Sequence, residues 1–412
     1  MNVQQYHLLD SRIDHYEQDI ITYQKTLTKI QAIGPENQGL GETEKAEQIK
    51  NYLNELGVDE LIEVNAPDTR VSSGIRPNIL AMIKGKSSEK TIWIMSHMDI
   101  VPAGDPSLWE SDPFDIIVKE DKIYGRGTED NQQGIVSSLL LLKALREEQI
   151  KLPYNLGFAI VSDEEAGSEY GIQHVLKQRP DLFKPTDWII IPDAGNEQGT
   201  MIEVAEKSIL WVKCEIKGKQ THGSTPEKGI NAHSAGAHLI INMENLYQDF
   251  DKSDRVYDPP ISTFAPTKKE ANVDNINTIP GLDVIYFDCR ILPDYSLNDV
   301  KDRILQYANE IENQFGVSIT LSYPQNVSAP PPTPADTPVA LALIKAVKDV
   351  LKREALSMGI GGGTVASYFR EAGLPAVCWC TVDDTLHGPN EYCKIENVIN
   401  DAKVFAHVCL QD

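Results

Sequence analysis

Histidine, aspartate and glutamate residues that can bind metal ions lie in short, separate segments of the chain. Imidazole and carboxylate ligands together suit zinc, cobalt or manganese. A pair of such ions can activate a water molecule and polarise a carbonyl group. The residue types therefore predict two divalent metal ions, a set of ligands for them and one spare carboxylate. The candidates are His97, Asp130, Glu164, Glu165, Asp193 and His387.

Three of these segments follow short apolar runs that contain β-branched residues. The runs occupy residues 91–95, 155–161 and 188–191, and each ends just before a candidate ligand. Their length and composition predict buried strands. Ligand sites in open α/β sheets lie beyond the carboxyl ends of the strands. We therefore expect the candidate ligands to meet at one edge of such a sheet.

Each candidate also has a simpler interpretation when it is taken alone. A histidine after a strand is more often a turn residue, Asp193 could form an Asx-turn or cap a helix, and Glu164-Glu165 could be a solvated turn. The combination favours the metal site. Asp99 lies two residues after His97 and can accept the second ring proton, which fixes the tautomer of that imidazole. The two adjacent glutamates offer one ligand and one free base.

Further motifs extend this pattern over roughly residues 90–395. They are Ser-His-Met-Asp (96–99), Trp-Glu-Ser-Asp-Pro-Phe (109–114), Ile-Tyr-Gly-Arg-Gly-Thr-Glu-Asp (123–130), Glu-Glu (164–165), Pro-Asp-Ala (192–194) and His-Gly-Pro-Asn-Glu (387–391). In this order, they resemble the signatures of the M20 family of metallopeptidases and amidohydrolases. That family includes succinyl-diaminopimelate desuccinylase, acetylornithine deacetylase, carboxypeptidase G2-like enzymes and aminoacylases. The resemblance implies a metallo-exopeptidase-like α/β catalytic domain, whose mixed central sheet is flanked by helices, with an inserted lid.

The resemblance implies a role for each metal ligand. Asp130 bridges the two ions. His97 and Asp193 complete one site, and Glu165 and His387 complete the other. The expected cofactors are two divalent cations, Zn²⁺ first, with Co²⁺ or Mn²⁺ as alternatives.

Two further acidic residues and one peptide bond also receive roles from the resemblance. Asp99 orients His97. Glu164 is not a ligand but the general base, which takes a proton from the attacking water and passes it to the leaving amine. A cis peptide bond is expected between Asp130 and Asn131.

The middle of the chain has its own alternation of strands and helices. Its order suggests a ferredoxin-like β-α-β-β-α-β sandwich, which also matches the lid or dimerisation domain of the M20 family. We expect a discontinuous catalytic domain of residues 1–206 and 326–412, interrupted by a lid of residues 207–325. The predicted strands cover 207–216, 281–290 and 317–323, and the predicted helices cover 231–247 and 297–315.

Three polar residues of the expected lid are candidates for substrate binding. Taken alone, His222 is best explained as a turn residue in a Gly/Pro-rich loop. The resemblance implies instead that it reaches the active site of the partner subunit in a homodimer and stabilises the oxyanion. Asn277 and Arg290 match positions that hold the substrate carboxylate, a task that suits arginine. The simpler alternative for Arg290 is a surface ion pair at the end of a strand.

A glycine-rich loop at residues 359–366 departs from the family pattern. Val365 stands where an acidic residue often occurs in the family. The backbone of Gly362, Gly363 and Thr364 could still line the substrate pocket. No Gly-Lys-Ser/Thr follows the glycines, so a phosphate-binding loop is poorly supported.

Composition narrows the class of protein. A length of 412 residues is enough for two or three domains, and the net charge of −23 disfavours nucleic acid and anionic membranes as partners. No run approaches the roughly 20 apolar residues of a spanning helix. The first residues lack the basic and apolar regions of a signal peptide, and six cysteines do not form a disulfide framework. We therefore expect a cytoplasmic protein.

The sequence predicts a dinuclear metal-dependent hydrolase that cleaves a peptide or N-acyl amide bond next to a free carboxylate and releases an amino acid. Its substrate would be a small peptide or an N-acyl amino acid. The sequence does not separate a dipeptidase or carboxypeptidase from a specific N-deacylase. A nucleotide-dependent α/β enzyme that uses the loop at 359–364 is a further alternative. A catalytically silent family member is another, and the intact Glu164-Glu165 pair argues against it.

Overall fold

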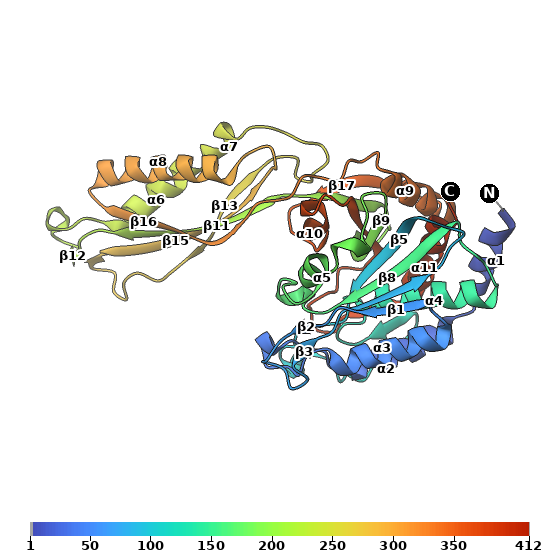
Figure 1. The fold of residues 1–412 in the computed structure, drawn as a ribbon. Helices are drawn as coiled ribbons and strands as arrows, with labels where there is room; N and C mark the ends of the chain where they lie inside the picture. The colour runs from blue at the N-terminus through green and yellow to red at the C-terminus, as the bar shows by residue number, and fades with distance from the viewer. Residues whose placement is uncertain (1–2, 412) are drawn as a thin grey trace. The chain divides into compact units, whose positions relative to one another are not determined.

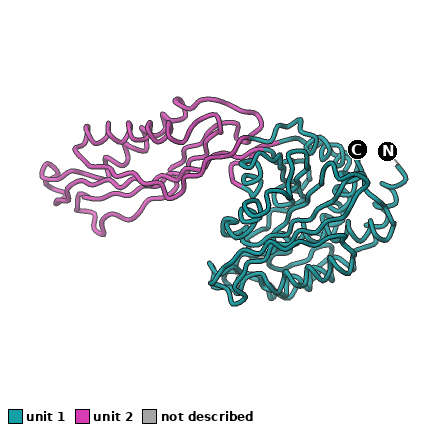
Figure 2. Tube along the Cα trace, viewed as in Figure 1, with its two compact units in different colours: residues 1–204, 332–357, 364–412 teal, residues 205–331, 358–363 magenta. Residues whose placement is uncertain are grey.

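The computed structural model describes residues 3–411, which fold into two compact units. The first unit contains the chain up to residue 204, residues 332–357 and the chain from 364 onward (Figure 2). The second contains residues 205–331 and 358–363. The chain therefore leaves the first unit at residue 205, returns at residue 332 and enters the second unit once more for residues 358–363. That these units are the catalytic and lid domains, with boundaries at 206 and 325, stays a prediction.

An eight-stranded mixed sheet forms the centre of the first unit, and its last two strands run across the boundary between the units. The neighbours β8-β5-β9-β18 are parallel, whereas β1, β4 and β10 pair antiparallel. The apolar run at 91–95 is buried on both faces of the sheet, as parallel strands require. Across the sheet the strands are β1 (Glu60–Glu63), β4 (Ile79–Ile83), β8 (Tyr154–Val161), β5 (Ser87–His97), β9 (Trp188–Asn196), β18 (Ala376–Thr381), β10 (Met201–Glu206) and β17 (Leu356–Ile360).

Helices cover the sheet on both faces (Figure 1). On one face, a core of Trp93, Met95, Ile189 and Phe369 joins the sheet to two short helices, α5 (Ile172–Gln178) and α10 (Ala366–Glu371). The second layer is built around α4, which is buried over almost its whole length and packs on α11. Its helices are α1 (Val3–Ile13), α2 (Glu17–Lys29), α3 (Thr43–Leu56), α4 (Gln132–Glu147), α9 (Pro338–Leu351) and α11 (Ile395–Cys409). This architecture confirms the predicted fold class.

Small sheets complete the first unit. β2 and β3 form a hairpin, and β19 pairs with β7 next to β6, which ties the segment after His387 to the segment before Asp130. Their bounds are β2 (Ala66–Pro67), β3 (Ile75–Arg76), β6 (Ile117–Lys119), β7 (Lys122–Tyr124) and β19 (Tyr392–Lys394).

The second unit has the predicted β-α-β-β-α-β order. Its antiparallel sheet runs β13-β15-β11-β16, with α6 and α8 packed on one face, and the short strands β12 and β14 pair separately. The elements are β11 (Ser208–Lys217), β12 (Thr221–His222), α6 (Ala232–Met243), α7 (Leu246–Asp249), β13 (Thr263–Lys269), β14 (Thr278–Ile279), β15 (Leu282–Ile291), α8 (Leu297–Phe315) and β16 (Ser318–Val327).

Two details of this unit differ from the sequence prediction. The predicted helix at 231–247 is two helices, because α6 ends at Met243 and α7 begins at Leu246. The edge strand β13 was not located from the sequence. It contains Pro266, which a central strand does not tolerate but an edge strand does.

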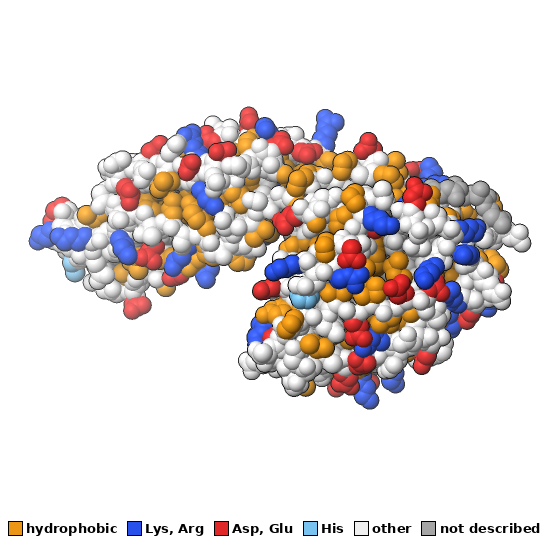
Figure 3. All heavy atoms as spheres, viewed as in Figure 1, with side chains coloured by type: hydrophobic (Ala, Val, Ile, Leu, Met, Phe, Trp, Pro, Cys, Tyr) orange, Lys and Arg blue, Asp and Glu red, His pale blue; other side chains and the backbone are white. Residues whose placement is uncertain are grey.

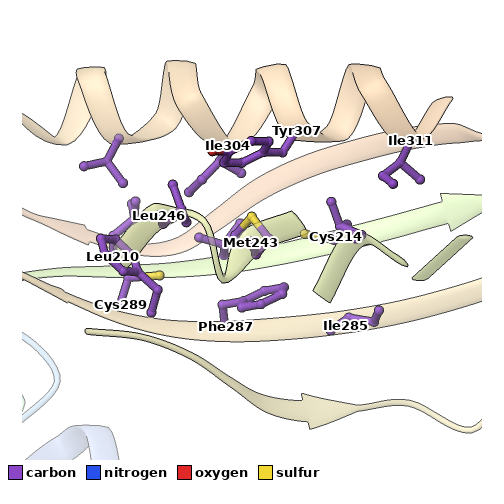
Figure 4. Packing of buried hydrophobic residues seen from close by; sticks show 14 of the residues in the cluster. Leu210, Cys214, Met243, Leu246, Ile285, Phe287, Cys289, Ile304, Tyr307 and Ile311 are labelled. Atoms are coloured by element: carbon purple, nitrogen blue, oxygen red, sulfur yellow. The ribbon is translucent and has the colours of Figure 1, made fainter. Parts of the chain in front are cut away.

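The core of the second unit follows from the periodicity of its elements. Alternate residues of β11 face the helices, and Leu210 and Cys214 meet Met243 of α6 (Figure 4). Residues at the i, i+4 and i+7 positions of α8, Val300, Ile304 and Tyr307, close this core from above. The alternate residues of β11 on the other face are partly or fully exposed and include the apolar Ile209 and Trp211 beside Lys213, Glu215 and Lys217.

Within residues 3–411, no helix combines the length and the apolar character needed to cross a membrane. On the face shown in Figure 3, acidic and basic side chains are interspersed rather than gathered by sign.

Candidate active site

Three neighbouring strands bring their carboxyl ends to one edge of the central sheet. His97 is the last residue of β5, and its register partner on β8 is Val161. Glu164 and Glu165 form a short 3-10 turn just beyond β8, and Asp193 lies near the end of β9. Parallel strands with adjacent ends place these side chains together, as the apolar runs predicted.

The other two candidate ligands reach this edge from loops. Asp130 precedes the first turn of α4, and its peptide bond to Asn131 is cis, as the resemblance predicted. His387 lies in the loop between β18 and β19. Thr385 donates two hydrogen bonds in this loop, from its amide and its hydroxyl, to Glu129 Oε2, each at 2.7 Å. The neighbour of Asp130 therefore anchors the loop that carries His387.

The two carboxylate oxygens of Asp130 point to two different imidazoles. Oδ1 lies 2.9 Å from Nε2 of His97, and Oδ2 lies 3.1 Å from Nε2 of His387. Nε2 of His97 is also 3.4 Å from Oδ1 of Asp193. Nε2 of His387 is 3.0 Å from Oε2 of Glu165. The geometry is that of one carboxylate shared by two clusters.

The same five side chains are the predicted metal ligands, and four of them, all except His387, belong to two overlapping groups of donor atoms that could hold a metal ion. In each of two overlapping groups, His97 with Asp130 and Glu165, and His97 with Glu164 and Asp193, one donor atom per residue lies within 4.8 Å of the others. Nitrogen and oxygen donors at this spacing suit first-row divalent ions.

The electrostatics of the cluster reflect several carboxylates that converge in a buried place. Burial and the charge of Asp193 raise the pKa of Glu164 well above its usual range. Hydrogen bonds to Asp130 and Glu165 raise the pKa of His387 to about 10. Burial opposes protonation of His97, but the Asp193 and Asp130 carboxylates raise its pKa well above the usual value. Without metal, protons on the two imidazoles thus compensate the negative charge of the converging carboxylates. Bound cations would displace these protons and compensate the same charge.

Asp99 contacts both His97 and the Glu164–Glu165 turn. Its two carboxylate oxygens accept hydrogen bonds from the backbone amides of Glu164 and Glu165, each at 3.1 Å. His97 Nδ1 is 3.1 Å from the backbone carbonyl of Asp99 and 3.5 Å from its carboxylate. The carboxylate therefore holds the glutamate turn, while the backbone carbonyl is the nearer partner of the imidazole.

Glu391 organises the Asp130 loop, although the sequence motif assigned it no role. This buried carboxylate accepts hydrogen bonds from the backbone amides of Gly127, Glu129 and Asp130 and from the guanidinium of Arg126. Burial and the nearby Asp130 charge raise its pKa to about 7. Its only signal in the sequence is its place in the motif at 387–391.

Asn131 and Arg126 also support the ligands. Nδ2 of Asn131 donates to Oδ1 of Asp193 at 2.7 Å and to the carbonyl of Pro192 at 2.6 Å. The buried guanidinium of Arg126 donates to the carbonyl of His387 at 3.2 Å. Arg126 lies inside the motif at 123–130 and Asn131 directly follows it, but their partners lie far away along the chain.

His222 and Asn277 lie together in the second unit. β12 pairs with β14 so that His222 faces Thr278, and the amide of Gly223 donates to the carbonyl of Asn277 at 2.6 Å. Both side chains are exposed, and Nδ1 of His222 lies 2.7 Å from the hydroxyl of Ser224. Their predicted roles toward a substrate stay predictions.

Arg290 has partners within its own unit. Its Nε and Nη2 donate to the carboxylate of Asp288 at 2.6 and 3.0 Å, and its Nη1 donates to the carbonyl of Gly361 at 2.8 Å. The ion pair considered as the simpler alternative is therefore present. It also holds the start of the glycine-rich loop that contains Gly362 and Gly363.

Thr364 follows these glycines. Its hydroxyl accepts the amide of Ala366 at 3.2 Å, and its carbonyl accepts the hydroxyl of Ser367 at 2.7 Å, which starts α10. A role of this segment in lining a substrate pocket stays a prediction.

The model of peptidase family M20/M25/M40 matches residues 93–411 of the chain. An uncharacterized metallohydrolase of Methanococcus maripaludis is 43% identical, over 95% of this chain and 98% of that protein. A succinyl-diaminopimelate desuccinylase of a Sulfurovum species is 27% identical over 79% of this chain and 85% of its own length. Among solved structures, a tripeptidase of Staphylococcus aureus aligns with a TM-score of 0.72 and 20% identity, covering 96% of this chain and 98% of that one.

Proposed function

Because this chain belongs to the peptidase family M20/M25/M40, we propose that it is a dinuclear metallohydrolase that cleaves a peptide or N-acyl amide bond next to a free carboxylate. The observation that carries this proposal is the shared carboxylate of Asp130. Its two oxygens face His97 and His387, and each imidazole has a further carboxylate beside it. Two ions with one bridging ligand fit this arrangement.

The predicted ligand assignment is retained in the proposal. His97 and Asp193 would hold one ion, Glu165 and His387 the other, and Asp130 both. Zn²⁺ suits these nitrogen and oxygen donors, as do Co²⁺ and Mn²⁺. Bound ions would supply Lewis acidity toward the scissile carbonyl and lower the pKa of water.

Glu164 would act as the general base. It is mostly buried beside the ligand cluster, with Oε2 3.9 Å from Nε2 of His97. It would take a proton from the attacking water and deliver that proton to the nitrogen of the leaving amine. The hydrogen bond from its backbone amide to Asp99 keeps it at the cluster.

The second unit would supply the groups that bind substrate. His222 would donate a hydrogen bond to the oxyanion, and Asn277 with Arg290 would hold the substrate carboxylate. Arg290 already binds the carboxylate of Asp288 in a bidentate manner, which supports its suitability for this anion. A substrate carboxylate would either displace Asp288 from Arg290 or accept hydrogen bonds from the N–H groups of Arg290 that Asp288 does not use.

A specific N-deacylase is the second candidate. It is favoured by the desuccinylase among the relatives, which spans most of this chain. Peptidase and deacylase differ in the group on the acyl side of the bond, whereas the ligand cluster serves both reactions. A small molecule, either a peptide or an N-acyl amino acid, is the proposed substrate in both cases.

We further propose that the protein works as a homodimer in the cytoplasm. The exposed His222 and Asn277 in the second unit support a shared site, and six buried cysteine thiols suit a reducing compartment. The strong negative charge argues against nucleic acid as a partner.

The test is a hydrolysis screen. Purified protein is stripped with a chelator, reloaded with zinc, cobalt or manganese, and offered dipeptides, tripeptides and N-acyl amino acids. We expect release of a free amino acid only with metal, and no release from substrates whose carboxylate is amidated. Equal cleavage of the amidated substrates would remove the carboxylate requirement. Equal activity of stripped and reloaded protein would overturn the metal-dependent mechanism.

A further inference from the structure

A buried chain of ion pairs adjoins the turn that carries Glu164. Nε of Arg76 donates to Glu42 at 2.7 Å, and Nη2 of Arg76 also pairs with that carboxylate. The same Nη2 is 3.2 Å from Oδ1 of Asp163. Glu42 and Arg76 have no exposed side-chain surface, and Asp163 is nearly buried. Burying these charges is costly, so the chain persists only because its members are paired.

Asp163 immediately precedes Glu164 and shapes the turn of residues 162–171, which we call the base turn. Its φ is +65°, a conformation that is uncommon for residues other than glycine. Its carbonyl accepts the amide of Ser168 at 2.6 Å, and its Oδ2 accepts the amide of Tyr170 at 2.9 Å. The carboxylate of Asp163 therefore connects the start of the base turn to Arg76 through Oδ1 and to the far end of the turn through Oδ2.

Asn78 fixes the two ends of the base turn to the same part of the chain. Its Oδ1 accepts the amide of Ser162 at 3.1 Å, and its Nδ2 donates to the carbonyl of Tyr170 at 2.9 Å. Glu42, Arg76 and Asn78 all precede residue 93, where the match to the family model begins. The support of the turn is thus built by a segment outside that match.

We propose that Asp163, held by Arg76, is a positioning residue for the base Glu164. This inference rests on the proposed role of Glu164. Glu164 must present its carboxylate to the attacking water, and a displacement of about 1 Å in a catalytic group can cost roughly 10²-fold in rate. The ion pair to Arg76 fixes the position of Asp163, the residue directly before Glu164.

Asp163→Asn tests the inference, and Asp68→Asn is its matched control. Both aspartates are buried to the same degree, with 2% of the side chain exposed, and both lie near Arg76, at 3.2 and 3.6 Å. Only Asp163 adjoins Glu164. We expect Asp163→Asn to lower kcat by 10- to 100-fold with little change in KM, and Asp68→Asn to keep kcat within about twofold. Arg76→Lys, which keeps the charge but loses the planar fork, should resemble Asp163→Asn.

A double mutant separates positioning from general damage. In the Glu164→Gln background, adding Asp163→Asn should lower the residual kcat by less than twofold, because the group being positioned is already gone. The content of bound zinc, measured on the same samples, should stay at the wild-type value in Asp163→Asn.

Three results would overturn the inference. In the first, Asp163→Asn lowers kcat by the same factor with and without Glu164→Gln. In the second, the kcat of Asp163→Asn equals that of Asp68→Asn. In the third, Asp163→Asn loses as much zinc as Glu165→Ala does. Wild-type turnover in Glu164→Gln would instead remove the proposed base, and this inference with it. Loss of turnover in Glu164→Gln without any loss in Asp163→Asn would remove this inference alone.

Discussion

At the scale of single residues, the adjacent glutamates have different surroundings. Oε2 of Glu165 is 3.0 Å from Nε2 of His387, whereas Oε2 of the desolvated Glu164 is 3.9 Å from Nε2 of His97. We predict that Glu164→Gln keeps its metal but loses about 10²–10⁴-fold in kcat, the usual contribution of a positioned proton-transfer group. Steady-state kinetics on a substrate from the screen, with metal analysis of the same protein, make the measurement. Near-normal kcat would show that another group is the base.

Glu165→Ala is the complementary change. We expect it to weaken metal retention, because one of the two carboxylates beside His387 is removed. The measurement is the chelator concentration that removes half of the bound metal, compared between Glu165→Ala and Glu164→Gln. Equal resistance of the two variants would contradict the division of roles.

At the scale of elements, the contact between β7 and β19 is secured by a buried pair. Arg126 donates to Glu391, and that carboxylate also receives the backbone amide of Asp130. We predict that Arg126→Met destabilises the protein by about 3–5 kcal/mol, because it leaves a buried carboxylate without its cation. Urea unfolding measures the loss. Lys119→Met, which breaks an exposed pair with Glu110, is the control and should leave the free energy of unfolding close to that of the wild-type protein.

A second carboxylate joins three elements and gives stability a pH dependence. Asp401 of α11 accepts hydrogen bonds from Gln133 of α4 and from the amide of Thr381 in β18. Burial raises the pKa of Asp401 to about 7. Between the unfolded pKa, about 3.9, and 7, the folded state binds more protons at this residue, so its contribution to stability falls as pH rises, by up to about 1.4 kcal/mol per pH unit.

Asp401→Asn should therefore flatten the pH profile of stability. The free energy of unfolding is measured by urea denaturation at pH 5 and pH 7 for both proteins. We expect the wild-type value to decline more between these pH values than the value for the variant. Parallel profiles would show that Asp401 titrates alike in the folded and unfolded states.

At the scale of the whole molecule, the proposed chemistry is divided between two units. The candidate ligands all lie in the first unit, and His222 with Asn277 lies in the second. If each site borrows these residues from the neighbouring subunit of a two-fold dimer, a mixture of Glu164→Ala and His222→Ala subunits should regain activity. A heterodimer would contain one site with both residues intact.

The mixing experiment needs proof that subunits exchange. Affinity tags of two kinds, one on each variant, allow heterodimers to be isolated before the assay. We expect activity of up to half of the wild-type value per heterodimer. Inactive heterodimers would place the action of His222 within its own chain or make it structural.

The sequence by itself determined the parts of the protein that depend on local pattern. The apolar run 91–95 became a strand that is buried on both faces. The α6–β15–α8 pattern became a sandwich, because burial on one face imposes a period on neighbouring residues. Ordered motifs then identified the family and the candidate ligands. The edge strand β13 was not predicted, because an edge strand needs little apolar periodicity.

Only the tertiary structure decided which distant groups meet. It joined Arg76 to Asp163 and Asn131 to Asp193, whereas the position of Asp130 between His97 and His387 was already implied by the resemblance to the family. It also showed the bidentate pair between Arg290 and Asp288. Local sequence does not show such pairs, because partners far apart along the chain come together only through the packing of strands and helices. The opposite charge that each buried group needs is supplied by the element that lies beside it.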